Sequence, residues 1–238
     1  MAPDQRVLHE SAALEAHDLY RFYRAGDEET LALRGVSLVV APGEVVAVTG
    51  PSGSGKSTLL SLLAGLDEPD GGYVLVAGQR MSHRSEGERT VLRRRLVGVL
   101  RQSGNLLDHL DVRSNIALVR SLRSRSGSVL PAVEQLLDRV GLSDRAGALP
   151  RELSGGEMAR AGLAVALAGG PAVLIADEPT GELDLVTERR VLTLIREAAA
   201  GGTAIVVASH SPEVAEGAHR VLRLADGRWA DVDDEAAA

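Results

Sequence analysis

The segment from residue 50 to 57 restricts the possible folds of this chain more than any other part of the sequence. It reads GPSGSGKS, fits the pattern G-x-x-x-x-G-K-[ST], and lies between an apolar run, 45–48, and an apolar helical pattern that begins at Thr58. Glycines let the backbone curl so that successive N–H groups point into one concavity, to which the following helix presents its positive end. A Gly/Ser-rich surface turn could share this composition, but the order strand, loop, helix favours a phosphate-binding loop.

The side chains of this loop have the chemistry that a nucleotide and its metal ion require. Lys56 would reach the β and γ phosphates, and the hydroxyl of Ser57 is a hard oxygen ligand suited to Mg²⁺. The candidate binding residues of the loop are Gly50, Pro51, Ser52, Gly53, Ser54, Gly55, Lys56, Ser57 and Thr58.

The composition limits the class of protein in which such a nucleotide site could act. The chain has 238 residues, 45% of them hydrophobic, which suits one compact α/β unit with an inserted part. It has no cysteine, so disulfide frameworks and thiolate metal sites are excluded and a cytosolic location is expected. No stretch reaches the roughly 18 to 20 apolar residues that cross a bilayer, and the first residues lack a secretory apolar region. The net charge of −7 argues against nucleic acid as a partner.

Three of the five aromatic residues gather just before the phosphate-binding loop. They are Tyr20, Phe22 and Tyr23, at the end of a predicted strand over 13–20 that pairs with another over 36–40. Two interpretations stay open: a ring that stacks on a nucleotide base, with Tyr23 as the candidate, or packing in the core of a hairpin.

A pair of acidic residues ends an apolar run later in the chain. The run 172–176 predicts a strand buried in a parallel sheet, and Asp177 and Glu178 follow it. Paired acids at the end of an apolar strand are costly to bury without partners, so they indicate a nearby cation. Asp177 fits Mg²⁺ ligation through water, and Glu178 fits a base or a water-positioning group.

Two further polar residues follow predicted strands of the same sheet. The run 203–208 delivers His210 to the carboxyl edge of the sheet, where ligands of open α/β sheets bind, and we interpret His210 as a phosphate contact. Gln102 follows the run 96–100 and could orient water or touch Mg²⁺, although a lone glutamine is a weak signal.

The middle of the chain predicts helices. Segment 103–152 lacks strand runs, and Pro131 and Gly141 frame a helix over 132–140. A charged segment over 82–95 also predicts a helix, whose arginines we interpret as a solvated face rather than a lipid or RNA contact. The glycine-rich stretch Ser154, Gly155, Gly156 and Glu157 begins a further helix that either accepts an anion or is an ordinary Ser-capped helix.

The order of these motifs resembles the ATP-binding subunits of ABC transporters over nearly the entire chain. The resemblance is carried by GPSGSGKST at 50–58, Gln102, LSGGE at 153–157, VLIADEPTGELD at 173–184 and His210. Within the family, the chain looks most like the macrolide-exporter and lipoprotein-release ATPases. The resemblance implies an α/β fold: a P-loop NTPase with a RecA-like core of mostly parallel sheet, an antiparallel β subdomain and an inserted helical subdomain. One domain, 1–238, would comprise core and β subdomain over about 1–102 and 160–238, and the helical subdomain over about 103–159.

The same resemblance implies a role for each motif residue. Tyr23 would stack on adenine, Ser57 and Gln102 would serve Mg²⁺, Glu178 would polarise the attacking water, and His210 would contact the γ-phosphate. Asp184 would lie in a loop that communicates across a dimer. Segment 154–157 would close on the ATP of a second copy, in a homodimer or a heterodimer of such ATPases. Separate transmembrane permease subunits would be the partners, and the chain would lie peripherally at the cytoplasmic face of the membrane.

Some positions depart from the family pattern. Ala159 and Val165 replace customary polar residues of the helix after LSGGE, Glu182 replaces asparagine or serine, and Ser211 stands where aspartate is common. We therefore expect ATP hydrolysis to be slow in the isolated subunit. This sequence lacks the guanine-reading segment of a GTPase, the second cassette of a two-cassette translation factor and the long coiled coil of a chromosome ATPase. A non-transport regulator of a membrane partner remains as the alternative function.

Overall fold

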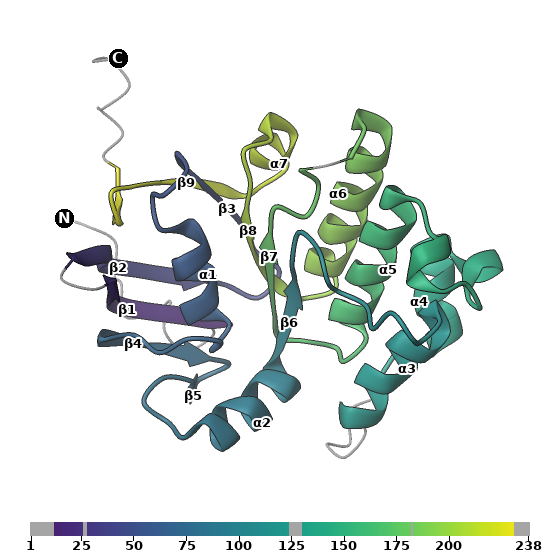
Figure 1. Ribbon diagram of the computed structural model, residues 1–238, viewed down its shortest axis with the longest axis horizontal. Coiled ribbons are helices and arrows are strands. Elements are labelled where there is room, and N and C mark those ends of the chain that lie inside the picture. The colour runs from purple at the N-terminus through teal and green to yellow at the C-terminus, as the bar shows by residue number, and fades with distance from the viewer. Residues whose placement is uncertain (1–11, 26–27, 124–129, 182, 231–238) are drawn as a thin grey trace.

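The computed structural model describes residues 12–25, 28–123, 130–181 and 183–230, and it forms two sheets with one helix between them (Figure 1). Glu182, one of the positions that depart from the family pattern, lies outside the described residues. The strands are β1 (Leu14–Ala25), β2 (Glu28–Val40), β3 (Val45–Thr49), β4 (Gly71–Val76), β5 (Gln79–Arg80), β6 (Val97–Leu100), β7 (Val173–Asp177), β8 (Ala204–Ala208), β9 (Arg220–Ala225) and β10 (Arg228–Trp229). The helices are α1 (Lys56–Leu63), α2 (Glu86–Leu96), α3 (Val112–Arg123), α4 (Val133–Arg139), α5 (Gly155–Leu167), α6 (Leu185–Ala200) and α7 (Pro212–Glu216).

The larger sheet has the order β10-β9-β3-β8-β7-β6, and its pairs from β9 to β6 are parallel. Alternate residues of β3 enter two different hydrophobic clusters. Val46 and Val48 face the cluster that contains α1, whereas Val45 and Ala47 face the cluster that contains α5 and α6. Because β3 is buried on both faces, its apolar residues are continuous rather than alternating, as the sequence indicated.

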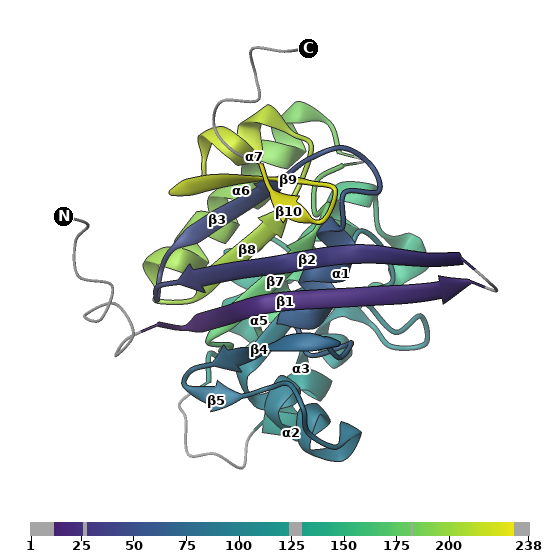
Figure 2. The ribbon, with the colours of Figure 1, turned by 90° about the vertical axis from the view of Figure 1, so that its left-hand side faces the viewer.

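The smaller sheet is antiparallel, with the order β2-β1-β4-β5, and Figure 2 shows its long strands crossing in front of α1. Strand β1 continues five residues past the predicted end at Tyr20, to Ala25. Tyr20, Phe22 and Tyr23 are 41%, 39% and 41% exposed, so the interpretation that they pack in a hairpin core is wrong. In this last part of β1 the aromatic residues are interspersed with arginine, and the strand is partly exposed to solvent. An apolar pattern in the sequence therefore did not reveal that the strand extends past Tyr20.

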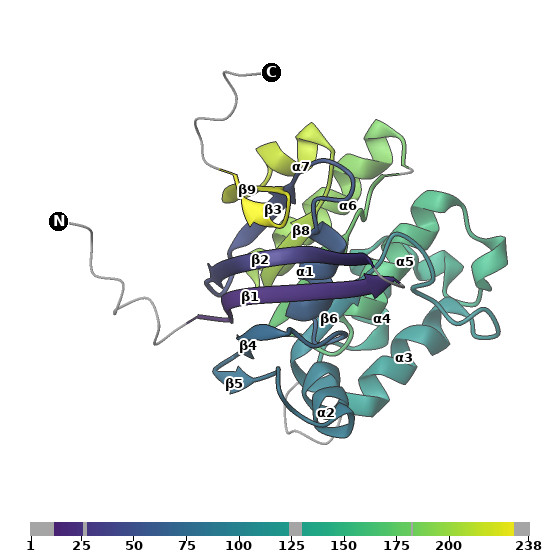
Figure 3. The same cartoon turned by 60° about the vertical axis from the view of Figure 1, so that its left-hand side comes forward.

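Helices α3 and α4 lie at the end of the molecule away from β1 and β2 (Figures 1 and 3). The predicted helix over 132–140 is confirmed as α4, and the segment 103–152 contains no strand among its described residues. No helix of the described chain has both the length and the apolar character that crossing a bilayer demands.

Two arginines of α2, Arg89 and Arg93, are engaged with neighbouring groups, so the interpretation of a solvated face does not hold for them. Arg89 forms ion pairs with Glu68 and Glu86, and Arg93 donates to the carbonyl of Gly65 at 2.6 Å and to Glu86 at 3.1 Å. These contacts tie α2 to the turn after α1.

Candidate nucleotide-binding site

The phosphate-binding loop adopts a backbone that only glycine accommodates at its key positions. Gly50, Gly53 and Gly55 have φ values of 143°, 78° and 103°, which lie in the region that side chains disfavour. A Cβ atom on Gly50 would lie 2.1 Å from the carbonyl oxygen of Leu224, and one on Gly55 would lie 2.5 Å from that of Ala32. A Cβ atom on Gly53 would meet nothing within 4 Å, so the loop is open there to an approaching ligand.

Helix α1 begins immediately after this loop with its first N–H groups available. Its N-cap is Gly55, which has no side chain to accept from them, and the first turn of a helix has no acceptor of its own. The ammonium of Lys56 is buried and donates to the carbonyls of Gly50 at 2.7 Å and Pro51 at 3.0 Å. The buried hydroxyl of Ser54 has no hydrogen-bond partner in the described residues. The free amides of α1 and the ammonium of Lys56, which lines the cavity described next, therefore fit the phosphates of a nucleotide.

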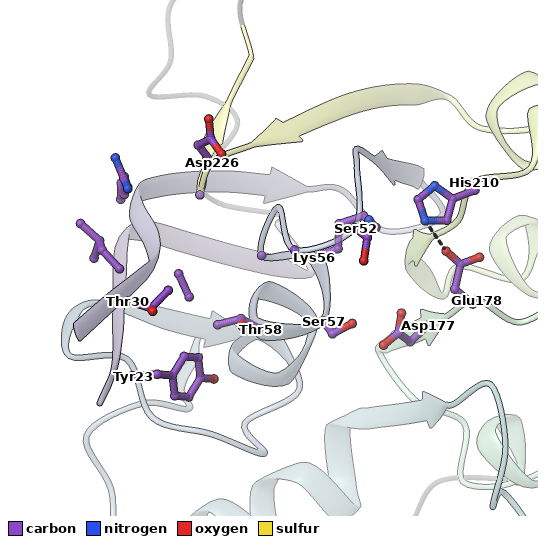
Figure 4. A pocket seen from close by; sticks show the side chains of 16 residues that line it. Tyr23, Thr30, Ser52, Lys56, Ser57, Thr58, Asp177, Glu178, His210 and Asp226 are labelled. Carbon is purple, nitrogen blue, oxygen red and sulfur yellow. Dashed lines mark ion pairs between the residues drawn. The ribbon is translucent and has the colours of Figure 1, made fainter. Parts of the chain in front are cut away.

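A cavity of about 480 Å³ joins this loop to the carboxyl edge of the parallel sheet (Figure 4). Lys56 and Ser57 line it from one side, and Asp177, Glu178 and His210 line it from the other. These residues come from α1, from the end of β7 and from the loop after β8, as the sequence predicted. Their convergence follows from parallel strands that end at one edge of the sheet.

Glu178 has the most constrained backbone of the acidic pair. Its φ is 45°, which is uncommon outside glycine, and its N–H donates to the carbonyl of Ala208 at 2.9 Å. Its carboxylate Oε1 lies 3.4 Å from Nε2 of His210, and this contact links the ends of β7 and β8. Left-handed conformations of this kind cost about 1–3 kcal/mol and gather at functional sites, because the rest of the fold holds them in place.

Tyr23 lies at the opposite end of the same cavity from the acidic pair (Figure 4). The sequence did not single out Thr30, Arg34, Asp226 or Gly227, which also line it. Asp226 and Gly227 form the turn between β9 and β10. It is joined to the loop because the N–H of Gly227 donates to the carbonyl of Ser54 at 3.1 Å.

Gln102 is placed differently from the other predicted metal-site residues. It does not line the cavity of the phosphate-binding loop but two adjoining ones, in which Glu178 also takes part. It is exposed on the loop that follows β6. Within this chain, Gln102 therefore approaches the site from the side of Glu178 rather than from the side of Ser57.

The glycine-rich segment before α5 lies outside this cavity as well. Ser154 is the N-cap of α5, and Ser154 and Glu157 form a reciprocal capping box with distances of 2.8 and 3.3 Å. Hydrogen bonds from the backbone and side chain of Ser154 lower the pKa of Glu157, and Arg145, 3.3 Å away, adds to the effect. Ser154 and Gly155 are exposed, so the end of this helix is accessible to a second molecule.

Asp184 likewise acts as a helix cap in this chain. It accepts from the N–H groups of Val186 and Thr187 at the start of α6, and from the hydroxyl of Thr187 at 2.7 Å. These bonds, led by the one from the Thr187 hydroxyl, lower the pKa of Asp184. A Cβ atom on Gly156 would lie 2.5 Å from Cγ2 of Thr187, so the starts of α5 and α6 are in close contact.

Three of the positions that depart from the family pattern lie among the described residues, and none of the three lines the phosphate-binding cavity. Ala159 lines the cavity beside Gln102, and Val165 packs against the core. The hydroxyl of Ser211 donates to Glu213 at 3.1 Å. None of these three positions alters the loop that would hold the phosphates.

Comparisons with known proteins agree with this geometry. Residues 33–181 match the family described as ABC transporter. The chain is 40% identical to the lipoprotein-releasing system ATP-binding protein LolD of Acinetobacter baylyi, over 92% of this chain and 97% of the relative. It is also 40% identical to the macrolide export ATP-binding/permease protein MacB of Shigella flexneri, over 90% of this chain but 33% of that longer protein.

Solved structures give the same result for the fold. An ATP-binding cassette dimer in a post-hydrolysis state, bound to ADP and Pi, has a TM-score of 0.83 and 30% identity, over 92% of this chain and 97% of that one. A second dimeric bacterial ABC transporter cassette has a TM-score of 0.82 at the same identity. The predicted fold class and the predicted likeness to macrolide-exporter and lipoprotein-release ATPases are therefore confirmed, and this chain belongs to the ATP-binding cassette family of ABC transporters.

Proposed function

We propose that this chain binds ATP with Mg²⁺, hydrolyses it as a head-to-tail dimer, and so powers export or extraction of a substrate through separate membrane subunits. The observation that carries the proposal is the single cavity in which Lys56 and Ser57 face Asp177, Glu178 and His210. A phosphate cradle that faces a carboxylate able to orient water is the arrangement that hydrolysis of a terminal phosphate requires.

Ser57 and Asp177 are the residues that would hold Mg²⁺, with Gln102 joining from the adjoining cavity. Within the described residues, no group of three or more His, Asp or Glu side chains is arranged to hold a metal ion. Such a sparse site suits Mg²⁺, which keeps several waters and completes its shell with substrate phosphates. When bound, the ion would neutralise charge on the phosphate oxygens.

Glu178 would act as the base or as the group that orients the attacking water. Its carboxylate is partly exposed to the cavity, and its strained backbone sets the side chain beside His210. His210 would contact the γ-phosphate from the end of β8, while the ammonium of Lys56 and the loop amides would hold the β and γ phosphates. Tyr23 would stack on adenine at the far end of the cavity.

Ser154, Gly155 and Gly156 would act on the ATP of a second copy. They do not line the phosphate-binding cavity of their own chain, although Gly155 lines the adjoining cavity with Gln102 and Glu178. Ser154 and Gly155 are exposed, so this segment is accessible to another molecule. Two copies related head to tail would each supply this segment to the other, with Asp184 near the contact. ATP would then stabilise the dimer through its γ-phosphate, and hydrolysis would remove that differential contact.

The relatives named for lipoprotein release and macrolide export suggest the kind of work that the dimer performs. We expect membrane permease subunits as partners and a peripheral position at the membrane face where ATP is present. We also propose that α3, α4 and the first residues of α5 form a helical subdomain over about 103–159, inserted in the core. Co-purification of this chain from membranes with a permease, rather than with a signalling protein or cell-wall enzyme, would separate transport from the regulatory alternative.

The variant Glu178→Gln tests the proposal. It keeps the shape of the side chain but removes the base, so ATP binding should persist, a dimer should accumulate, and hydrolysis should fall by roughly 10²-fold or more. Size-exclusion chromatography with ATP and Mg²⁺, beside a phosphate-release assay, measures both. Glu197→Gln, an exposed change on α6, is the matched control and should behave as the wild type. A monomeric Glu178→Gln protein with undiminished turnover would exclude the mechanism.

A further inference from the structure

Arg21 and Asp67 contact the side chain of Tyr23 and also contact each other. The hydroxyl of Tyr23 donates to Oδ2 of Asp67 at 3.1 Å. Arg21 binds the same carboxylate with two nitrogens, Nε at 2.9 Å and one terminal nitrogen at 3.0 Å. The guanidinium carbon of Arg21 lies 4.8 Å from the centroid of the Tyr23 ring. Arginine, carboxylate and phenol thus form a triangle in which each member contacts the other two.

The triangle is fixed to the turn that follows α1. The N–H of Glu68 donates to Asp67 at 2.8 Å, and Asp70 accepts from the N–H of Phe22 at 2.8 Å and from Arg21 at 3.2 Å. Burial alone lowers the pKa of Arg21, but its contacts with Tyr23, Asp67 and Asp70 outweigh burial and raise that pKa. The guanidinium is therefore permanently charged where it lies against the ring.

The two faces of the ring have different surroundings. Tyr23 lines the cavity that contains the phosphate-binding loop, whereas Arg21 and Asp67 do not line it. Arg21 thus lies over the ring on a side that does not line the cavity, and Tyr23 itself lines the space in which a nucleotide would lie (Figure 4). A bidentate arginine and an anchored phenol hydroxyl leave the ring little rotational freedom.

Helix α1 connects this support to the phosphates. Its first turn follows the phosphate-binding loop, and the turn after its last residue, Leu63, carries Asp67. Leu59, Leu62 and Leu63 are fully buried between the sheets, so the helix cannot shift easily. One rigid element therefore sets the separation between the phosphate site and the ring.

We propose that Arg21 and Asp67 are positioning residues that hold the Tyr23 ring ready for the base of the bound nucleotide. The inference rests on the proposed adenine-stacking role of Tyr23. A ring that is fixed before the ligand arrives avoids the entropy cost of immobilising it on binding. Loss of the support should therefore weaken the binding of a nucleotide by about three- to tenfold and leave a ligand without a base unaffected.

The experiment compares ATP with inorganic tripolyphosphate, both with Mg²⁺, by isothermal titration calorimetry on the full chain. Asp67→Asn, Tyr23→Phe and the double variant form a cycle on the contact between the carboxylate and the phenol. Glu197→Gln, an exposed change on α6, is the control for loss of a carboxylate away from the triangle. Tripolyphosphate affinity also reports whether each variant is folded.

The expected result is weaker ATP binding in Asp67→Asn and in Tyr23→Phe, no further loss in the double variant, and constant tripolyphosphate affinity. Arg21→Lys should also weaken ATP alone, because lysine cannot bind Asp67 with two nitrogens. Equal loss for both ligands, or additive losses in the cycle, would overturn the inference. Tyr23→Ala separates the stacking role of Tyr23 from the positioning role of Asp67. If Tyr23→Ala weakens the binding of ATP alone and Asp67→Asn does not, the stacking role is retained and the positioning role is excluded. If Tyr23→Ala weakens the binding of neither ATP nor tripolyphosphate, both the adenine-stacking role of Tyr23 and its proposed support are excluded.

Discussion

The two helices that begin with glycine-rich motifs differ at their N-termini. Helix α1 has Gly55 as its N-cap, without any side-chain acceptor, whereas α5 is closed by the reciprocal hydrogen bonds of Ser154 and Glu157. Both starts carry the positive end of a helix dipole, but α1 leaves its amides open while α5 already satisfies one of its own. The first is built to hold an anion by itself. The second can contribute to an anion that something else holds.

This difference explains how one nucleotide could depend on two copies of the chain. The phosphate-binding loop lies within a single copy and leaves no room for a side chain at Gly50 or Gly55, because a Cβ atom there would overlap the carbonyl oxygen of Leu224 or Ala32. The start of α5 has no such restriction at Gly155, where a Cβ atom would meet nothing within 4 Å. The same change from glycine to alanine should therefore have opposite consequences at the two motifs.

Gly55→Ala should have the largest effect. At φ 103°, a Cβ atom 2.5 Å from the carbonyl of Ala32 forces the loop to move, so we expect a loss of about 1–3 kcal/mol in folded-state stability and at least about tenfold in ATP affinity. Urea unfolding and calorimetry measure the two quantities. Normal ATP affinity in this variant would show that the loop tolerates another conformation.

Gly155→Ala is the counterpart at α5. Alanine favours the helix by up to about 1 kcal/mol and finds open space, so stability should be unchanged or higher and ATP affinity of the monomer should be unaltered. The added methyl would stand where a partner's phosphate approaches, so dimerisation and hydrolysis should both fall. Wild-type turnover in Gly155→Ala, measured by phosphate release at several protein concentrations, would contradict a contact between copies at this segment.

The sequence predicted most of the phosphate-binding site but not the two residues that contact Tyr23. The phosphate-binding loop, Asp177 and His210 were recognisable because each follows an apolar strand by a fixed local rule. Arg21 and Asp67 were not, since 46 residues separate them and only the pairing of β1 with β4 brings them together. The arginines of α2 also read as a basic face, because a sequence does not show that Glu68 lies beside Arg89.

Gly156→Ala should act on the stability of the chain and leave ATP affinity of the monomer unaltered. The new methyl would lie 2.5 Å from Cγ2 of Thr187, whose hydroxyl is bonded to Asp184, and we expect a loss of about 1–3 kcal/mol in stability. Thr187→Ser removes the obstructing methyl and keeps the hydroxyl, so the double variant should recover most of the loss in urea unfolding. Failure of this rescue would show that the contact between the starts of α5 and α6 is not the cause.

Glu157→Gln should have the smallest effect, and it tests the closed cap directly. Because hydrogen bonds from Ser154 lower the pKa of Glu157 in the folded chain, the carboxylate stabilises the fold above its ordinary pKa of 4.5 and loses that contribution as pH falls through the lowered value. Glutamine can still accept from Ser154 but does not titrate, so the variant should be slightly less stable near pH 7 and should converge with the wild type in acid. Unfolding midpoints between about pH 3 and 7 measure this, with Glu197→Gln as the control for loss of a surface charge. If the difference between wild type and Glu157→Gln were constant across that range, the cap of α5 would not depend on the charge of Glu157, and the contrast with the open start of α1 would rest on the hydroxyl of Ser154 alone.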